Sequence, residues 1–402
     1  ITFGENILSI SVDCMTTIPI TASSRRIEAV DCVRGFAVVG IILIHFLEHL
    51  NFYAFPEPTS FDQTLWDIVF YLGASKMYAI FALLFGFSCY IQHHNQEERG
   101  HDFRLRFIWR MILLFLWGMI DLLFFNGDIL CTYAVLGLLL VPLVKASDKV
   151  LLVVAFVAFC QPVEIIWFLR GIINPDTAPL NMSLGPCWKA TFAACKEGGF
   201  WDVARANLEN GLQINFGWAL ENGRLTQTFF LFVLGMWAGR KNLFQYRPGH
   251  MRIWLKMMVA AIILFAISQL LLNCLPFDQM AIAIKKSLKI LLQAWRNFGM
   301  MVFYVTGLLW LYYRTPLHKA IHRLACIGKM SLTCYLLQSI VGGFLFYNWG
   351  LSLYEVSGHC ESFLMGIVFC IVLYGFCKFW TKNFRRGPLE ECWSKMTYLN
   401  FK

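Results

Sequence analysis

Long apolar stretches recur along the chain and are separated by short polar segments. A helix needs about 20 mainly apolar residues to cross roughly 30 Å of hydrocarbon, and most of these stretches approach that length. We therefore expect an all-α, polytopic integral membrane protein with about ten transmembrane helices. The expected spans are Gly35–Leu50, Ile68–Ile91, Phe107–Phe125, Ile129–Val144, Val150–Leu169, Thr226–Ala238, Trp254–Cys274, Leu288–Tyr313, Leu324–Phe346 and Phe363–Trp380.

The composition supports the same class. Hydrophobic residues make up 58% of the 402 residues, aromatic residues 16% and charged residues only 15%, whereas soluble domains carry about 25% charged residues. So few charges cannot form a water-facing surface around this much apolar material. A soluble enzyme, a disordered chain, a collagen and a small disulfide-rich secreted domain are therefore excluded.

The net charge of +9 agrees with a membrane protein once the basic residues are placed between the expected spans. Most of the 34 Lys and Arg fall in alternate segments, on the same side as both termini. Because cytoplasmic loops carry an excess of Lys and Arg, we expect both termini to be cytoplasmic. No loop interleaves basic and aromatic residues into a groove, so we expect no nucleic-acid partner.

The chain is expected to contain one transmembrane domain over residues 25–402. Residues 1–24 are expected to form a flexible N-terminal segment, and Met15 is as good a candidate as Ile1 for the true start. Residues 170–225 form an extracytoplasmic loop that is too long for a simple turn. Within it, Phe200–Leu220 has helical amphipathic spacing, which indicates either a simple cap or a lid over an outer binding site.

The cysteines and histidines give no metal motif. No CxxC occurs among the 14 cysteines, and His93, His94 and His101 lack the ligand spacing of a zinc site, so we expect no metal. Cys187 and Cys195 share the external loop. They either remain free or form disulfides with each other, with Cys274 or with Cys360.

Arg34 and His45 are the first candidate functional pair. They are eleven residues apart, which is almost three helical turns and about 16 Å of rise, so both fall on nearly the same helix face. Arg34 at the cytoplasmic mouth can hold an anionic group, and a buried imidazole can accept a proton. The alternative is that Arg34 anchors the topology and His45 makes a packing hydrogen bond between helices.

Further ionisable and polar residues lie inside the expected spans, where such groups are costly and mark function by default. Asp121 and Asp128 flank the external end of the third span, and several others lie toward the outer half. We expect lysines and carboxylates to pair, and we expect a polar pocket that opens outward. The predicted substrate-binding residues are Lys76, Glu164, Gln338 and Tyr133.

These residues belong to a pattern that resembles the YeiB-like family, whose domain is known as domain of unknown function 418, within the transmembrane acyltransferase superfamily. The resemblance covers nearly all of the chain from Arg26 to Leu399. Individually weak and together specific, the matching stretches are Arg26–Ile41, Lys76–Phe87, Gly127–Gly137, Gly328–Ser339, Gly387–Glu390 and Thr397–Tyr398.

The resemblance implies an activity. Related acyltransferase family 3 proteins carry an Arg, ten residues and a His in the first span, as Arg34 and His45 do here, and they move acyl groups from cytoplasmic acyl-CoA to sugars or lipids. The lysosomal heparan-glucosamine acetyltransferase resembles a more distant relative. This chain departs from its nearer relatives, which commonly have Asn at the position of His45 and often His at the position of Asp121.

The expected function is therefore a multi-pass acyltransferase of the bacterial inner membrane, which moves an acyl group such as acetyl from cytoplasmic acyl-CoA to an extracytoplasmic sugar or lipid. Arg34, aided by Arg104, Arg106 and Arg110, would hold the CoA phosphates. His45 would act as the base or carry the acyl group, oriented by Asp128 or Asp121. The alternatives are a small-solute transporter or channel that uses Lys76, Asp121 and Glu164, and a non-catalytic protein of the same fold.

Overall fold

The computed structural model describes residues 27–50, 52 and 55–398, so the expected flexible segment 1–24 and the question of Met15 lie outside it. Within this part every regular element is helical, as predicted. The elements are α1 (Glu28–Leu47), α2 (Ser60–Gly73), α3 (Met77–Glu97), α4 (Phe103–Asp121), α5 (Leu130–Leu138), α6 (Asp148–Phe159), α7 (Pro162–Ile173), α8 (Gly185–Glu197), α9 (Phe200–Glu221), α10 (Arg224–Arg240), α11 (His250–Cys274), η1 (Phe277–Gln279), α12 (Ile282–Arg314), α13 (His318–His322), α14 (Ala325–Lys329), α15 (Ser331–Phe346), η2 (Leu353–Glu355), α16 (His359–Asn383) and α17 (Pro388–Thr397).

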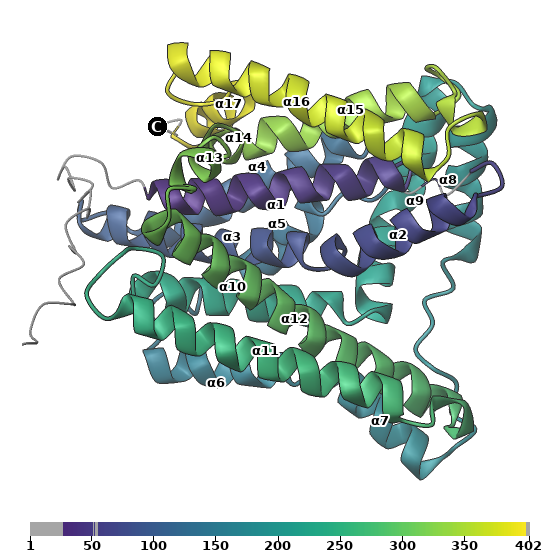
Figure 1. The fold of residues 1–402 in the computed structure, drawn as a ribbon, viewed down its shortest axis with the longest axis horizontal. Helices are drawn as coiled ribbons and strands as arrows, with labels where there is room; N and C mark the ends of the chain where they lie inside the picture. The colour runs from purple at the N-terminus through teal and green to yellow at the C-terminus, as the bar shows by residue number, and fades with distance from the viewer. Residues whose placement is uncertain (1–26, 51, 53–54, 399–402) are drawn as a thin grey trace, which may run out of the picture.

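The long helices run side by side along one axis of the molecule (Figure 1). Helix α1 lies at mid-height, with α15 and α16 above it and with α11 and α12 below it. The start of α1, the short helices α13 and α14, and α17 gather at the left end in this view, while α8 and α9 lie at the right end.

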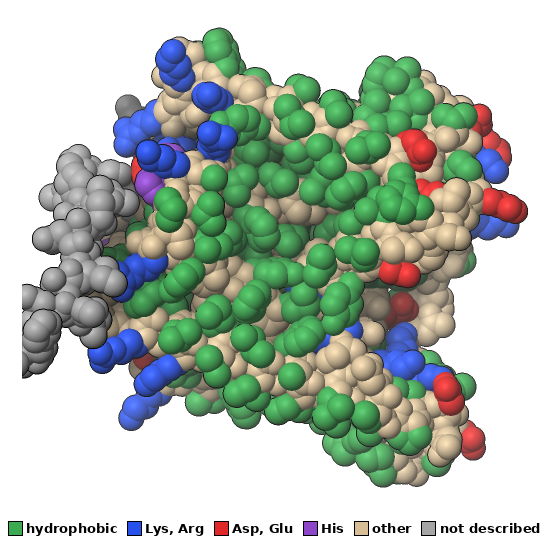
Figure 2. All heavy atoms as spheres, viewed as in Figure 1, with side chains coloured by type: hydrophobic (Ala, Val, Ile, Leu, Met, Phe, Trp, Pro, Cys, Tyr) green, Lys and Arg blue, Asp and Glu red, His purple; other side chains and the backbone are tan. Residues whose placement is uncertain are grey.

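The two ends differ in charge. Figure 2 shows Lys and Arg side chains concentrated at the left end, most of the acidic side chains in view toward the right, and a broad hydrophobic surface between them. We call the left end, where α1 begins and α17 lies, the basic end. A wide apolar surface between two polar ends is typical of a protein surrounded by lipid.

Within the described residues, four helical segments are long and apolar enough to cross a membrane: Glu28–Leu47, Ser60–Glu97, His250–Cys274 and His359–Asn383. Two bent pairs, α6 with α7 and α13–α14 with α15, raise the number to six if each pair is one span. The prediction of about ten spans goes beyond this set. Helix α4 lies where a span is expected but carries three arginines and Asp121, and α10 is only 17 residues long.

Four of the expected spans are interrupted, the second of them between α2 and α3. The fifth breaks between α6 and α7 with a bend of 44°, where Gln161 has a φ of 54° and Pro162 begins the next helix. The ninth bends by 76° between α14 and α15. The fourth contains the nine-residue helix α5 followed by turns. A break inside the bilayer exposes backbone groups that need other partners, so such breaks occur where protein surrounds them.

Close helix crossings at glycines position the basic end. A Cβ at Gly35 of α1 would lie 2.1 Å from the Leu324 carbonyl oxygen, and one at Gly328 of α14 would lie 1.9 Å from the Asp31 carbonyl oxygen. Small residues allow two backbones to approach in this way. The crossing holds α14 directly against the segment of α1 that carries Arg34.

The segment 170–225, which is expected to be extracytoplasmic, contains the helices α8 and α9. The amphipathic stretch predicted over Phe200–Leu220 is α9, which buries Val203, Asn207, Gly211 and Ile214 at spacings of three and four residues. Cys187 and Cys195 are both buried free thiols, so the free-thiol alternative holds in this structure.

Candidate functional site

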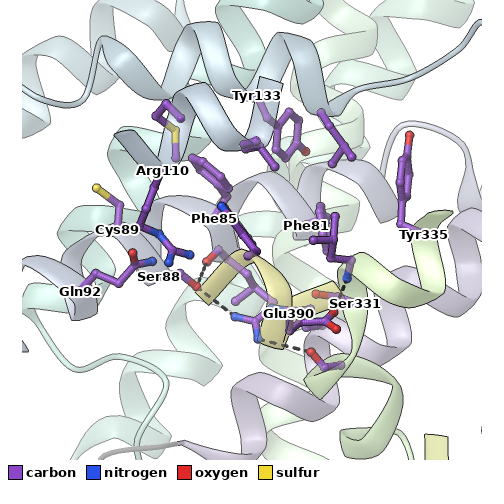
Figure 3. A pocket seen from close by; sticks show the side chains of 18 of the residues that line it. Phe81, Phe85, Ser88, Cys89, Gln92, Arg110, Tyr133, Ser331, Tyr335 and Glu390 are labelled. Carbon is purple, nitrogen blue, oxygen red and sulfur yellow. Dashed lines mark hydrogen bonds between the residues drawn. The ribbon is translucent and has the colours of Figure 1, made fainter. Parts of the chain in front are cut away.

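A cavity of about 220 Å³ lies among α1, α3, α4, α5, α14, α15 and α17, near the basic end. Figure 3 shows the labelled side chains that converge on it, among them Ser88, Arg110, Ser331 and Glu390. Its lining residues are Arg34, Phe81, Leu84, Phe85, Ser88, Cys89, Gln92, Phe107, Arg110, Met111, Leu114, Leu130, Tyr133, Gly328, Lys329, Ser331, Leu332, Tyr335, Glu390 and Trp393. The cations Arg34, Arg110 and Lys329 thus share one cavity with a wall of aromatic and aliphatic side chains.

Arg34 is held by three elements. Its guanidinium donates to the Asp31 carboxylate at 3.1 Å, to the Ser88 hydroxyl of α3 at 3.0 Å and to the Gly328 carbonyl at 3.5 Å. Its side chain is 18% exposed. The same residue therefore ties α1 to α3 and α14 and presents a cation to the cavity, so its anchoring and binding roles are compatible.

Arg110 lies under the C-terminal helix. Its guanidinium lies 4.2 Å from the centre of the Trp393 ring and donates to the Thr397 hydroxyl at 3.3 Å. Its Nε has no hydrogen-bond partner. Trp109, next to it, donates to the Met396 carbonyl at 2.9 Å, so α17 is fixed across the basic end of the cavity.

Glu390 of α17 caps the start of α15. Its carboxylate accepts from the backbone N–H groups of Leu332 and Thr333 at 2.7 and 3.1 Å and from the Thr333 hydroxyl at 2.6 Å. The first N–H groups of a helix lack partners within it and favour an anion. Glu390 and Lys329 were not among the sequence candidates, because only the fold brings α17 and α14 to this cavity.

Two of the four arginines predicted to bind the cofactor lie elsewhere. Arg104 is exposed and forms an ion pair with Asp102 at 2.8 Å; its hydrogen bonds to that carboxylate hold the pKa of Asp102 well below its usual range. Arg106 donates to Gln96 at 2.7 Å and lies 5.0 Å from the Tyr398 ring centre. Arg106 lies one helical turn before Arg110 on nearly the same face of α4, but neither it nor Arg104 lines the cavity.

His45 lies next to the far wall of this cavity. Its ring centre is 6.5 Å from that of Tyr335 and 5.1 Å from that of Phe125. Tyr335 lines the cavity and His45 does not. The cavity that Arg34 lines therefore stops short of His45 in this structure.

Beyond Tyr335 the structure brings together four of the predicted site residues in a polar cluster, in which His45 is half-buried and the other three are buried. Asp121 and Gln338 are 0% exposed and Asp128 is 1% exposed. Gln338 faces the His45 imidazole, and the Asp121 carboxyl lies close to Asp128 and to the Ser339 hydroxyl. We call His45, Asp121, Asp128 and Gln338 the core polar cluster.

Several atoms of the core polar cluster lack hydrogen bonds within the protein. They are His45 Nδ1, both carboxylate oxygens of Asp121 and both amide atoms of Gln338. Such groups cost free energy unless water or a ligand satisfies them. Unsatisfied buried polar groups concentrate at functional sites, so this cluster is the best candidate for chemistry in the described part of the chain.

Asp128 caps a helix. Its carboxylate accepts from the backbone N–H groups of Leu130 and Cys131 at 2.9 and 3.0 Å, which caps α5. Gly118 of α4 makes room for it, because a Cβ there would lie 2.7 Å from Asp128 Oδ2. The Asp121 oxygens accept no such backbone bonds, so they are more available to a ligand than those of Asp128.

The other predicted substrate-binding residues lie apart from this cluster. The Tyr133 hydroxyl donates to the Tyr78 carbonyl at 3.1 Å, and its ring lines the cavity. Glu164 on α7 interacts with Ser287 and Lys286. Lys76 donates to the Tyr71 carbonyl at 2.5 Å and has no carboxylate partner among the described residues, so the expectation that the buried lysines pair with carboxylates is wrong for it.

His49, one turn beyond His45, was missed. It is 0% exposed, its Nε2 lies 2.5 Å from the Ser362 hydroxyl oxygen, and its ring stacks on Phe346 at 4.3 Å. The sequence does contain a signal for His49: it follows His45 by four residues, so the two side chains fall on the same face if the helix continues. These contacts link the end of α1 to α16.

Comparison with known proteins gives two family matches. Residues 238–400 match the family described as "Protein of unknown function (DUF418)". Residues 26–176 match the family described as "Heparan-alpha-glucosaminide N-acetyltransferase, catalytic". The second range contains Arg34, His45, Asp121 and Asp128.

Curated relatives match over nearly the whole chain. The uncharacterised protein YxaH of Bacillus subtilis is 27% identical over 96% of this chain and 98% of its own length. The uncharacterised protein YeiB of Escherichia coli is 28% identical over 93% of this chain and 96% of its own length. An uncharacterised 39.9 kDa protein of Bacillus acidopullulyticus is 26% identical over 94% of this chain and 95% of its own. The comparisons confirm the resemblance to the YeiB-like family with its region of unknown function 418, and to the acetyltransferase superfamily, that the motifs of this sequence indicate.

Proposed function

We propose that the chain is a membrane acyltransferase that moves an acyl group, acetyl in the simplest case, from acyl-CoA at the basic end to a sugar or lipid acceptor on the opposite side. One observation carries the proposal. Tyr335 is shared between a cavity with cations at its mouth and the core polar cluster, because its ring lines the first and contacts His45 of the second.

The donor would bind at the basic end. Arg34, Arg110 and Lys329 would interact with the phosphate groups, since guanidinium and ammonium groups form strong charge-assisted hydrogen bonds to phosphate. The pantetheine arm would extend along Phe81, Phe85 and Leu114 toward Tyr335. The excess of Lys and Arg at this end favours the cytoplasmic side, where CoA is found, and a cell membrane such as the bacterial inner membrane as the location.

The transfer step would take place at His45 once Tyr335 moves aside. The acceptor oxygen or nitrogen attacks the thioester carbonyl while the imidazole removes its proton. The C–S bond then breaks, and the CoA thiolate takes the proton from the imidazolium, so the histidine returns to its starting form. In the alternative course His45 itself attacks the thioester and passes the acyl group on.

Asp121 and Gln338 would orient the imidazole and the acceptor. Both are buried, and both offer atoms that the protein leaves without hydrogen bonds. A buried polar group binds a ligand that completes its hydrogen bonds much more tightly than a ligand that leaves them unmade. The acceptor hydroxyl or amine would supply such a partner.

The test is transfer across a bilayer. The full chain is reconstituted into liposomes with labelled acetyl-CoA outside and glucosamine inside as the probe acceptor, because one matching family is described by acetylation of a glucosaminide. Labelled N-acetylglucosamine inside the liposomes supports the proposal. If acetyl-CoA neither stabilises the protein against heat nor loses its acetyl group, the proposed function is wrong.

A further inference from the structure

Three cations that lie far apart in the sequence meet away from the cavity and the core polar cluster. Lys76 stands at the junction of α2 and α3, Arg224 begins α10, and Arg296 lies in the middle of α12. Both arginines are close enough for their charges to act on Lys76. Mutual repulsion would drive such a group apart unless something else held it together.

Lys76 and Arg296 share the ring of Tyr71. Lys76 Nζ is 5.5 Å and the Arg296 guanidinium carbon 5.4 Å from the ring centre. Lys76 is 2% exposed, and its one hydrogen bond goes to the Tyr71 carbonyl at 2.5 Å. An ammonium has three donors, so two remain available.

The arginines are fixed by neutral groups. Arg224 donates to the Gln227 side-chain oxygen at 2.9 Å and to the Ser75 hydroxyl at 2.5 Å, and Arg296 donates to the Gln269 side-chain oxygen at 3.2 Å. The Nε atoms of both arginines are buried without a partner. None of the three cations forms an ion pair within residues 27–50, 52 and 55–398.

The location makes this arrangement costly. Lys76 lies within Ser60–Glu97, a segment apolar enough to cross a membrane. Charged side chains at membrane depth normally pair with a counter-charge, and a buried charge without a partner is strongly destabilising. Three cations that have donors left over and no carboxylate partner in the described part of the chain therefore form a site suited to an added anion.

The chemistry of the donors indicates a phosphate. Guanidinium N–H groups match the spacing of phosphate oxygens, and the ammonium adds a mobile point charge. The helices around the site face outward: α2 buries only Asp62 and Gly73, and α11 buries only Trp254, Ala261 and Ser268. Beside the site, Tyr71 is 41% and Leu72 is 49% exposed, so apolar side chains line the approach from the lipid side.

We propose that Lys76, Arg224 and Arg296 bind the phosphate group of an anionic lipid that enters from the bilayer beside α2 and α11. Tyr71, whose hydroxyl donates to Gln269 at 3.4 Å, lies over two of the cations and covers this entrance. The site does not depend on acyl transfer, since it shares no residue with the cavity or with the core polar cluster.

The experiment compares lipid environments. The full chain is placed in nanodiscs of phosphatidylcholine alone, of phosphatidylcholine with phosphatidylglycerol, and of phosphatidylcholine with inorganic phosphate in the buffer, and its thermal unfolding midpoint is measured. Binding to the folded state stabilises it by mass action, so phosphatidylglycerol should raise the midpoint by roughly 2–4 °C or more. Inorganic phosphate should have a much smaller effect.

Variants separate this site from general attraction to an anionic surface. Arg296→Gln and Lys76→Gln should lose most of the shift, and Lys76→Gln should unfold at the same or a higher temperature than the wild type in phosphatidylcholine alone, because it removes an uncompensated charge. Lys285→Gln is the control, since Lys285 pairs with exposed Asp278 at 2.6 Å and should keep the shift.

The proposal is overturned if phosphatidylglycerol does not stabilise the wild type, or if the control loses as much of the shift as Arg296→Gln does. If inorganic phosphate stabilises the protein and phosphatidylglycerol does not, the claim that the bound phosphate belongs to a lipid is wrong. These outcomes are independent of whether acetyl-CoA stabilises the protein, which tests the proposed enzyme activity separately.

Discussion

Tyr335 and His45 meet edge to face, with ring centres 6.5 Å apart and planes at 69°. Tyr335 comes from α15 and is also held by the backbone N–H of Ile129, which donates to its hydroxyl at 3.2 Å. Tyr335 therefore lies between the cavity near the basic end and the core polar cluster. The route of an acyl group toward His45 therefore depends on where this ring lies.

Replacing Tyr335 by a larger ring should slow transfer without weakening donor binding. In Tyr335→Trp the indole would fill the space beside His45, so acetyl transfer should fall by at least about tenfold, or about 1.4 kcal/mol in the barrier. Tyr335→Phe keeps the ring and loses only one hydrogen bond, so it should remain within a few-fold of wild type. The measurement is the transfer rate together with thermal stabilisation by acetyl-CoA. Equal rates for both variants would show that this ring does not control the route.

Gly118 should be intolerant of a side chain. A Cβ there would meet Cys131 Sγ at 2.6 Å, Asp128 Oδ2 at 2.7 Å and the Cys131 backbone nitrogen at 2.8 Å. Gly118→Ala should therefore push α5 from α4 and cost about 1–3 kcal/mol. Gly307→Ala in α12 is the control, because its Cβ would meet nothing within 4 Å, and it should be neutral or stabilising. Unfolding midpoints in detergent check both, and similar midpoints for the two variants would contradict the packing described.

Glu390 should stabilise the protein through the start of α15. Glu390→Gln weakens three hydrogen bonds at a helix N-terminus, and loss of such a cap costs about 0.5–2 kcal/mol. Glu391→Gln is the matched control, since its exposed carboxylate makes only long ion pairs to Arg386 at 3.7 Å and Lys395 at 3.8 Å, and such surface pairs are worth little. The midpoint of Glu390→Gln should be the lower of the two. Equal midpoints would mean that this cap contributes no stability.

Arg110 and Arg104, which the sequence grouped together, should behave differently. Arg110 lines the cavity, so Arg110→Gln should raise the KM for acetyl-CoA by about tenfold through the loss of one charge-assisted contact to phosphate. Arg104 pairs with Asp102 outside the cavity, and Arg104→Gln should change the KM by less than about twofold. Steady-state kinetics on the two reconstituted variants decide this. An unchanged KM in Arg110→Gln would remove it from the donor site.

The sequence predicts a helix well where one continuous apolar or amphipathic stretch determines it. Helix α9 over Phe200–Glu221 lies where the pattern predicts it, because its periodicity is local. Helix α1 over Glu28–Leu47 overlaps the predicted span Gly35–Leu50 but begins seven residues before it. The breaks at Gln161 and Met330 were not predicted. Both interrupt expected spans. After the second break, the backbone N–H groups of Leu332 and Thr333 donate to Glu390, a neighbour distant in sequence.

The candidate site is predictable from the sequence only in part. Ionisable and polar residues inside apolar runs stand out, so the sequence alone singles out His45, Asp121, Asp128 and Gln338. Glu390 and Lys329 sit in polar surroundings and give no such signal. The group of Lys76, Arg224 and Arg296 combines three separate segments, and only the contacts between α3, α10 and α12 reveal that they share a site.

The measurement that tests the central claim most directly is acetyl transfer by His45→Ala in liposomes, with His101→Ala, an exposed histidine outside the helices, as the control. Removal of a general base costs about 10²–10⁴-fold in rate, while donor binding at Arg34 and Arg110 should persist. The account predicts that His45→Ala retains stabilisation by acetyl-CoA and loses transfer by at least about a hundredfold, and that His101→Ala transfers at the wild-type rate. Transfer by His45→Ala at the rate of His101→Ala would contradict the account.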